Sequence, residues 1–339
     1  MKAARLHGPA DLRIDDVPRP VPGPGQALVR VVAYSPYGTD IGTFLNRGGR
    51  YVQQYPVGIG ADFSGIVEEL GPDVTGPAPG TRVSALSLDH CGECARCLGG
   101  RTNQCIDPAF AVQVRQTACE EYTLVSANKL CRLPDGVSFE EAAMLAGPVD
   151  ALNGFRLMGL AAGGAVTVIG VGAMGLGAIA TAKALGLQVT AVGGSGKRAD
   201  IAREIGADRV YPIPVHGYDV AAEVIEAQGP SDAIFESTAS PWGNEQAFRL
   251  AAMGGAIAIT GGSDLGIGGW TLVERELRLF GVRAGAGQAE VLAMIADGRL
   301  DVMSALSRRF AFDRAADAFA LLSGEKAADI GRVIIRIAD

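Results

Sequence analysis

The sequence predicts an α/β protein in two parts, a β-rich part with many turns and a doubly wound parallel sheet. Three observations predict this architecture. Short strand-like segments separated by Gly and Pro turns fill the chain before residue 148. Strand-like and helix-like segments alternate after it, and a glycine-rich motif follows the first of those strands. With 339 residues, the chain is long enough for two domains that each bury a core.

Short strands are expected in the first part. Residues 25–33 alternate between two faces and are rich in β-branched side chains. Segments Ile66–Leu70 and Thr81–Leu86 have the same character, with turns at Gly71-Pro72 and Pro79-Gly80. Short strands with frequent turns indicate a small barrel or sandwich.

The second part alternates between strands and helices. Val166–Ile169 is a continuous apolar run typical of a buried parallel strand, and a helix is expected from about Met174 to Leu185. The remaining expected elements are strands Gln188–Val192, Asp232–Glu236, Gly255–Thr260, Leu277–Gly281 and Gly331–Ile337, and helices Lys197–Ile205, Gly243–Leu250, Ala289–Asp297 and Arg314–Leu322. Alternating βα units place helices on both faces of a parallel sheet.

Composition excludes several classes of protein. Hydrophobic residues make up 48% and charged residues 20%, which is too apolar for a disordered chain. The net charge of −7 argues against a dedicated nucleic-acid binder. No apolar run reaches the roughly 18 residues of a membrane-spanning helix. The N-terminal residues lack the apolar stretch of a signal peptide, so a cytoplasmic location is expected.

A G-x-G-x-x-G motif runs from Gly170 to Gly175, after a strand and at the start of a helix. The first glycine makes the tight turn, Gly172 lets the backbone approach a pyrophosphate, and the third lets helix and strand pack closely. The backbone of Ala173 and Met174 adds N–H donors at the helix N-terminus. A glycine-rich turn without a ligand is the alternative, but this βαβ context favours a dinucleotide site of the Rossmann type.

The segment after the second strand predicts NADP(H) as the dinucleotide. An NAD site would place an acid there for the ribose 2′-hydroxyl, but none occurs before Asp200. Hydroxyl and cationic side chains would instead accept a 2′-phosphate. The residues expected at this phosphate are Gly193, Ser195, Lys197 and Arg198. Alternatively, the two cations are only a solvated first helical turn.

Four of the six cysteines form the pattern Cys91-x2-Cys94-x2-Cys97-x7-Cys105 in a turn-rich loop. Four thiolates at such a spacing can surround one Zn²⁺ tetrahedrally, with no position left for water. The sequence therefore predicts a structural zinc that stabilises the loop and takes no part in chemistry. The alternative is four free or oxidised thiols.

Over essentially its full length, the chain resembles the medium-chain dehydrogenase/reductase superfamily, and most of all its zinc-containing alcohol dehydrogenase branch. The segments that carry the resemblance are Pro22–Val29, Gly38-Thr39-Asp40, Gly60–Val67, the four-cysteine lobe, Leu133–Gly136 and Gly170–Gly175. The resemblance implies a GroES-like catalytic domain (1–148 and 286–339, with the zinc lobe at 90–106) and a Rossmann domain (149–285). It also implies a small-molecule substrate in the cleft between the domains, and a homodimer or homotetramer assembled through the cofactor-domain sheets.

The sequence departs from this family at the catalytic zinc. The family's ligands are usually a Cys before Gly-Thr-Asp, the His-Glu of a Gly-His-Glu motif, and a Cys, Glu or Asp after the Leu-Pro-Asp-Gly helix. Here these places hold Tyr37, Ala61-Asp62 and Ala146–Pro148. Because a zinc site needs three protein ligands, we expect the catalytic zinc to be absent and the structural zinc kept. A site rebuilt from Asp40, Asp62 or Asp150 is the alternative.

Without a Lewis acid, hydrogen-bond donors must stabilise the charge that hydride transfer creates. We therefore expect NADPH-dependent reduction of an activated double bond, of the enone, enal or iminium type. The resemblance places Thr39 at the family's proton-relay hydroxyl. Tyr37 stands beside it, either as a second donor or only as a filler of the cleft wall, and Asp40 and Asp62 orient these groups. Which of Tyr37 and Thr39 donates the proton stays open.

Two other functions fit the same residues. One is a zinc-independent alcohol dehydrogenase or carbonyl reductase that uses Thr39 and Tyr37 as the electrophile. The other is an NADP(H)-binding protein without activity. The identity of the substrate and the direction of the reaction are not encoded in any motif.

Overall fold

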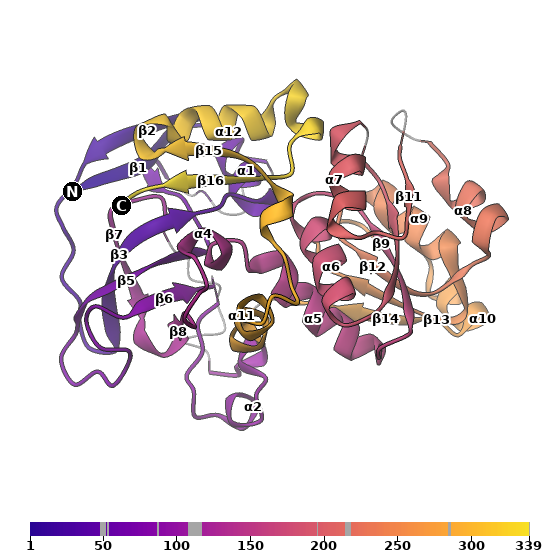
Figure 1. Cartoon of the computed structure of the whole chain (residues 1–339), viewed down its shortest axis with the longest axis horizontal. Coiled ribbons are helices and arrows are strands. Elements are labelled where there is room, and N and C mark those ends of the chain that lie inside the picture. The colour runs from indigo at the N-terminus through magenta and orange to yellow at the C-terminus, as the bar shows by residue number, and fades with distance from the viewer. Residues whose placement is uncertain are drawn as a thin grey trace. The chain divides into compact units, whose positions relative to one another are not determined.

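The computed structural model describes residues 1–47, 52, 54–86, 88–107, 117–194, 196–213, 218–283 and 286–338 (Figure 1). The chain divides into two compact units. The first comprises Met1–Ala146, Ala284–Ala296 and Leu306–Asp339, and the second Gly147–Arg283 and Asp297–Ala305. Residues 297–305 thus pack with the second unit, whereas the sequence-based boundaries grouped them with the first.

The first unit is built on two sheets. In the smaller sheet, β1 (Lys2–Gly8) lies between β2 (Asp11–Asp16) and β4 (Val57–Gly58), and both pairings are antiparallel. The larger sheet has seven strands in the order β15 (Leu306–Ala311), β16 (Arg332–Arg336), β3 (Gln26–Tyr34), β5 (Phe63–Leu70), β6 (Arg82–Ala85) and β8 (Cys131–Arg132), and β7 (Tyr122–Ser126) pairs with β3. The β-rich first part that the sequence predicts is therefore confirmed.

Strand β3 is the centre of this unit, since it pairs antiparallel with β5, β7 and β16. Seven of its nine residues are buried, so both of its faces contact the core. Tyr34 at its end packs against Phe319 (ring centroids 6.5 Å apart), and Phe44 packs against the same ring (5.2 Å). Phe319 belongs to helix α12 (Ala315–Ser323), which closes the apolar core.

The other helices of the first unit are short, apart from α11 (Gln288–Ala296). They are α1 (Gly38–Phe44), α2 (Ala95–Leu98) and α4 (Phe139–Ala142), with single 3₁₀ turns η1 (Thr102–Gln104), η2 (Ala127–Lys129), η4 (Phe312–Arg314) and η5 (Glu325–Asp329). Helix α4 begins at Ser138 with a capping box: Glu141 N–H donates to Ser138 Oγ (3.2 Å) and Ser138 N–H donates to Glu141 Oε2 (2.7 Å).

The second unit is a six-stranded parallel sheet. Its order is β11 (Arg209–Tyr211), β10 (Gln188–Val192), β9 (Ala165–Ile169), β12 (Ser231–Glu236), β13 (Ala251–Ile259) and β14 (Arg278–Gly281). Chain order along the sheet reverses between β9 and β12, which is the doubly wound topology and places the switch point there. This confirms the fold class that the sequence predicts.

Helices cover both faces of that sheet. They are α5 (Ala146–Met158), α6 (Ala173–Ala184), α7 (Lys197–Ile205), α8 (Val220–Gln228), α9 (Pro241–Leu250) and α10 (Gly269–Arg275), and η3 (Met303–Ala305) adds a 3₁₀ turn. Successive residues of β9 enter two separate apolar cores, Val168 on one face and Ile169 on the other. None of the described helices is both long and apolar enough to cross a membrane.

Candidate functional site

The four clustered cysteines lie together in the first unit. Cys91 Sγ is 3.9 Å from Cys97 Sγ and 3.6 Å from Cys105 Sγ, and Cys94 Sγ is 3.5 Å from Cys97 Sγ. Four thiolates around one Zn²⁺ at the usual Zn–S length have sulfurs about 3.8 Å apart. None of the four is in a disulfide. The cluster therefore fits a closed, tetrahedral zinc site.

Local backbone geometry brings these sulfurs together. Gly92 and Gly100 adopt positive φ (81° and 75°), which lets the loop turn sharply at both ends of α2. The N–H of Cys91 donates to Cys105 Sγ (3.4 Å), and the N–H of Cys94 donates to Cys91 Sγ (3.3 Å). These hydrogen bonds hold the Cys91 and Cys105 sulfurs in place on the loop.

The glycine-rich turn lies at the carboxyl end of β9 in the second unit. Gly170 has a φ of +94°, and a Cβ there would lie 2.8 Å from Ser237 Oγ. A Cβ at Gly175 would overlap the carbonyl oxygen of Gly170, whereas a Cβ at Gly172 would meet nothing within 4 Å. Gly172 is the N-cap of α6 and offers no side chain to the helix N–H groups. Open space beside unsatisfied N–H donors fits the phosphates of a dinucleotide.

The loop after β10 is also built from glycines. Gly193, Gly194 and Gly196 all have positive φ, at 130°, 70° and 54°. Lys197 and Arg198 begin α7, with Lys197 exposed and Arg198 half-buried. The nearest acid, Asp200, is paired with Arg203 (2.7 Å). Ser195, the remaining residue predicted here, lies outside the described residues.

Three of the predicted catalytic residues lie around the start of α1 in the first unit. Tyr37 is the N-cap, and its N–H donates to Asp40 Oδ2 (3.1 Å). Tyr37 and Thr39 are half-buried, whereas Asp40 is only 4% exposed. This hydrogen bond caps α1, and through it the buried carboxylate of Asp40 stabilises the turn that carries Tyr37 and Thr39.

A buried arginine that the sequence analysis missed lies close to these residues. Arg332, on β16, donates from Nη2 and Nε to Ser35 Oγ (2.7 and 3.2 Å). Burial lowers the pKa of the Arg332 guanidinium to about 10, and the charges of Asp62, Tyr37 and Asp40 oppose that shift. Arg332 is therefore still charged at neutral pH. Tyr37, Asp40 and Asp62 thus interact electrostatically with one buried cation, which a single arginine in an otherwise apolar strand did not indicate in the sequence.

Comparison with known proteins places the chain in a family. Residues 23–135 match the alcohol dehydrogenase GroES-like domain, and residues 173–297 match the zinc-binding dehydrogenase domain. Alcohol dehydrogenase from Geobacillus stearothermophilus is 31% identical over 253 residues, which is 74% of each chain. The chain belongs to the medium-chain dehydrogenase/reductase superfamily.

Within this superfamily, the chain is of the zinc-containing, alcohol dehydrogenase-like type. Sorbitol dehydrogenase from Bacillus subtilis (strain 168) is 26% identical over 327 residues, covering 94% of this chain and 92% of that protein. An Escherichia coli oxidoreductase of unknown specificity has a TM-score of 0.87 and 26% identity, covering 100% of this chain and 99% of the other. These relatives favour the alcohol and carbonyl alternative over reduction of a double bond.

One group of side chains in this medium-chain dehydrogenase has the arrangement of a metal site. Within the described ranges, the four cysteines are the one group of three or more His, Cys, Asp or Glu residues whose ligand atoms all lie within 4.8 Å of one another. Asp40, Asp62 and Asp150 belong to no such group.

A second buried cation, Lys129, also lies in the first unit. Its Nζ is 3.2 Å from Asp89 Oδ1, and both side chains are less than one-tenth exposed. Burial lowers the pKa of Lys129, and the charges of Asp89 and Asp62 oppose this. The lysine lines a cavity of about 30 Å³, enough for one water molecule, together with Leu86, Leu88, His90, Thr102, Asn103 and Gln288.

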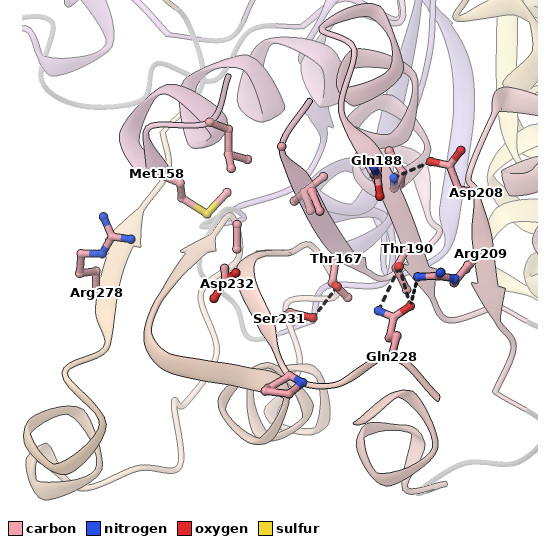
Figure 2. Close-up of a pocket in the computed structure, with 17 residues that line it drawn as sticks. Met158, Thr167, Gln188, Thr190, Asp208, Arg209, Gln228, Ser231, Asp232 and Arg278 are labelled. Atoms are coloured by element: carbon pink, nitrogen blue, oxygen red, sulfur yellow. Dashed lines mark hydrogen bonds between the residues drawn. The ribbon is translucent and has the colours of Figure 1, made fainter. Parts of the chain in front are cut away.

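A larger pocket of about 710 Å³ lies at the amino ends of β9, β10 and β12 in the second unit (Figure 2). Its polar groups bind one another. Thr167 Oγ1 is 2.7 Å from Ser231 Oγ, and Gln228 bridges Thr190 (3.1 Å) and Arg209 (3.0 Å). Because the glycine-rich turn is at the opposite ends of these strands, this pocket is not the dinucleotide site.

Proposed function

We propose that this enzyme interconverts an alcohol or polyol and its carbonyl compound, using NADP(H) and no catalytic metal. The alcohol and sorbitol dehydrogenases among its relatives support the substrate class. The observation that carries the metal-free part is that, among the described residues, Asp40 and Asp62 belong to no group of metal ligands, whereas their charges and that of Tyr37 act on the buried guanidinium of Arg332.

The residues of the cluster have separate roles in this mechanism. A bound NADPH supplies the hydride. The hydroxyls of Tyr37 and Thr39 donate hydrogen bonds to the substrate oxygen, where negative charge develops, and one of them delivers the proton. Asp40 holds the turn that carries both donors through its bond to Tyr37 N–H.

Reduction of an activated double bond is the second candidate. In the part of the chain that the structure describes, no metal-ligand group other than the four cysteines is found, and this favours the second candidate, since charge on a conjugated oxygen or nitrogen needs only hydrogen-bond donors. Assays of NADPH oxidation against enones, iminiums, aldehydes and ketones separate the two. Turnover confined to saturated carbonyls supports the main proposal, and turnover confined to conjugated double bonds supports the second. Tight NADPH binding without turnover of any of these substrates would contradict both candidates and indicate an NADP(H)-binding protein without activity.

Metal content tests the metal-free part directly. We expect one zinc per chain in untagged protein, held by the four cysteines. Two zincs per chain, with the second removed by a chelator together with activity, would contradict the proposal.

NADP(H) preference rests on the loop after β10. Its glycines adopt positive φ, Lys197 and Arg198 supply positive charge, and Asp200 is engaged by Arg203. We expect NADPH to bind at least about tenfold tighter than NADH, because each charge-assisted hydrogen bond contributes about 1.5–3 kcal/mol. Equal affinities in fluorescence titrations would contradict this preference.

A further inference from the structure

The switch point of the parallel sheet holds a buried carboxyl group. Glu236 is the last residue of β12, pairs with Ile169 on β9, and is fully buried. Its Oε1 accepts hydrogen bonds from Thr238 N–H (2.7 Å) and from the Thr238 hydroxyl. Among the described residues, Oε2 has no hydrogen-bond partner.

Helix α9 encloses this carboxyl. A Cβ at Gly243, in the first turn of α9, would overlap both Glu236 Oε1 and Thr238 Oγ1. Thr238 Oγ1 is also 2.8 Å from the hydroxyl of Ser240, the N-cap of α9. Only a glycine lets the helix lie this close to the turn, so Glu236 is held between the sheet and the helix.

The residue between Glu236 and Thr238 contacts the dinucleotide turn. Ser237 N–H donates to the carbonyl of Ile169 (2.9 Å). Ser237 Oγ is 2.9 Å from the same carbonyl and 3.2 Å from the carbonyl of Gly170. A Cβ at Gly170 or Gly175 would lie 2.8 or 2.9 Å from this hydroxyl oxygen. The hydrogen bonds of Ser237 therefore connect the turn after β12 to the glycine-rich turn.

This arrangement is unfavourable for stability. Burial raises the pKa of Glu236, while hydrogen bonds from Thr238 and from the backbone of Ala239 lower it. A buried oxygen without a partner loses its hydration and gains nothing in return, whereas an apolar side chain of similar size would avoid this loss. The same turn carries Ala239 at a φ of +53°, a conformation that a non-glycine residue rarely adopts. Two unfavourable features at the switch point indicate a role in binding.

We propose that Glu236 is a positioning residue for the dinucleotide. Through Oε1 it fixes Thr238, which sets Ser237 against the carbonyls of Ile169 and Gly170 and so keeps the glycine-rich turn in its binding geometry. This inference rests on the dinucleotide part of the proposed function, but not on the substrate or on the absence of a catalytic metal.

Three variants of the full-length enzyme test it. Glu236→Leu removes both accepted hydrogen bonds at similar volume, Glu236→Gln keeps an acceptor at Oε1, and Glu245→Gln changes an exposed carboxylate on helix α9. Thermal unfolding without ligand and fluorescence titration with NADPH and NADH are measured for each. We expect Glu236→Leu to bind NADPH at least about tenfold more weakly at a temperature where it is fully folded, the effect of about one lost hydrogen bond. Glu236→Gln and Glu245→Gln should bind within about threefold of wild type.

A purely structural role predicts a different pattern. Glu236→Leu would then unfold at a lower temperature but bind NADPH with unchanged affinity while it is folded, and that result overturns the proposal. Should Glu236→Leu not fold, Thr238→Val removes the hydroxyl donor and keeps the backbone N–H. Weaker binding by Thr238→Val supports the proposal, and unchanged binding overturns it. If the wild-type protein binds neither NADPH nor NADH, the proposed function is wrong, and this result is distinguishable from a failure of the Glu236 proposal alone.

Discussion

At the scale of single residues, two glycines of the G-x-G-x-x-G turn differ in the space around them. Gly175 has no room for a methyl group, because a Cβ would overlap the carbonyl oxygen of Gly170. Gly172 has an ordinary φ of −80° and open space around it. The fold itself therefore requires glycine at 175, whereas the proposed dinucleotide would require it at 172, where a ligand would approach the backbone.

Alanine at each position distinguishes these roles. We expect Gly175→Ala to lower the free energy of unfolding by about 1–3 kcal/mol, as overpacking does, and to weaken NADPH binding as well. Gly172→Ala should unfold within about 0.5 kcal/mol of wild type but bind NADPH much more weakly, because its methyl group enters the ligand's space. Urea unfolding and fluorescence titration measure both. Normal binding by Gly172→Ala would show that no phosphate approaches this backbone.

Arg332 is a second residue-scale test. Arg332→Met leaves Asp40 and Asp62 without their shared buried cation, and breaking a buried charge pair costs about 3–5 kcal/mol. Arg308→Met, on the exposed face of the neighbouring strand β15, is the matched control, with an expected change under about 0.5 kcal/mol. Equal losses in the two variants, measured by urea unfolding, would contradict a charge cluster around Arg332.

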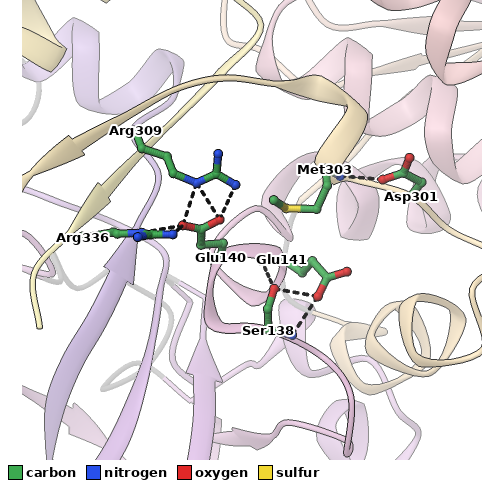
Figure 3. Close-up of polar contacts among 7 residues, drawn as sticks. All are labelled: Ser138, Glu140, Glu141, Asp301, Met303, Arg309 and Arg336. Atoms are coloured by element: carbon green, nitrogen blue, oxygen red, sulfur yellow. Dashed lines mark hydrogen bonds and ion pairs between the residues drawn. The ribbon is translucent and has the colours of Figure 1, made fainter. Parts of the chain in front are cut away.

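At the scale of elements, an ion-pair network ties α4 to two strands (Figure 3). Arg309 of β15 donates from Nε and Nη2 to the carboxylate of Glu140 (2.8–3.0 Å), and Arg336 of β16 donates from Nε to the same group (2.7 Å). These hydrogen bonds lower the pKa of Glu140. Because the pKa of Glu140 is lower in the folded state than in the unfolded state, its ion pairs stabilise the protein fully at a pH above the unfolded-state pKa. This stabilisation is lost as the pH falls through the folded-state pKa.

Glu140→Gln should therefore destabilise the protein in a pH-dependent way. Because both arginines are about half exposed, we expect a loss of only about 1 kcal/mol at pH 7. The difference from wild type should shrink below about pH 4.3, where the unfolded carboxyl becomes protonated, and vanish at still lower pH. Urea unfolding of both proteins between pH 7 and pH 3 measures it. A difference that stays constant with pH would mean that charge is not involved.

The zinc lobe is the element whose chemistry the sequence predicted best. We expect Cys105→Ser to lose the bound zinc and to make residues 90–106 sensitive to limited proteolysis, because four thiolates close one site. Cys131→Ser is the matched control, since Cys131 is half-buried and outside the cluster. Zinc measured by elemental analysis should fall only in Cys105→Ser. Retained zinc in that variant would contradict four-cysteine ligation.

Local patterns explain which elements the sequence predicted. The expected helix Lys197–Ile205 matches α7, and the strand Gln188–Val192 matches β10, because periodicity and glycine turns mark their ends. Helix α5 was missed, since it begins at Ala146-Gly147-Pro148, which looks like a turn. Arg332, Lys129 and Glu236 were missed for another reason. Their roles come from burial and from partners distant in the chain, which no local spacing records.

At the scale of the whole molecule, the second unit has an unprotected side. β14 is the last strand of the parallel sheet, and its outer edge has no partner strand in the described chain. Helix α10, which contacts the neighbouring strand β13, buries none of its residues, and Trp270 and Val273 are 69% and 64% exposed. Met253 is 71% exposed. An open strand edge next to exposed apolar side chains is a surface that proteins normally cover.

We propose that a second copy of the chain covers this side, which gives a homodimer or a homotetramer. Wild type should then sediment as a dimer or tetramer at micromolar concentration. The double substitution Trp270→Glu and Val273→Glu should shift it to the monomer without a change in circular dichroism, because two buried charges would oppose association. Val21→Glu, at an equally exposed apolar residue of the first unit, should leave the mass unchanged. A monomeric wild type, or a double variant that keeps its mass, would exclude this surface as the interface.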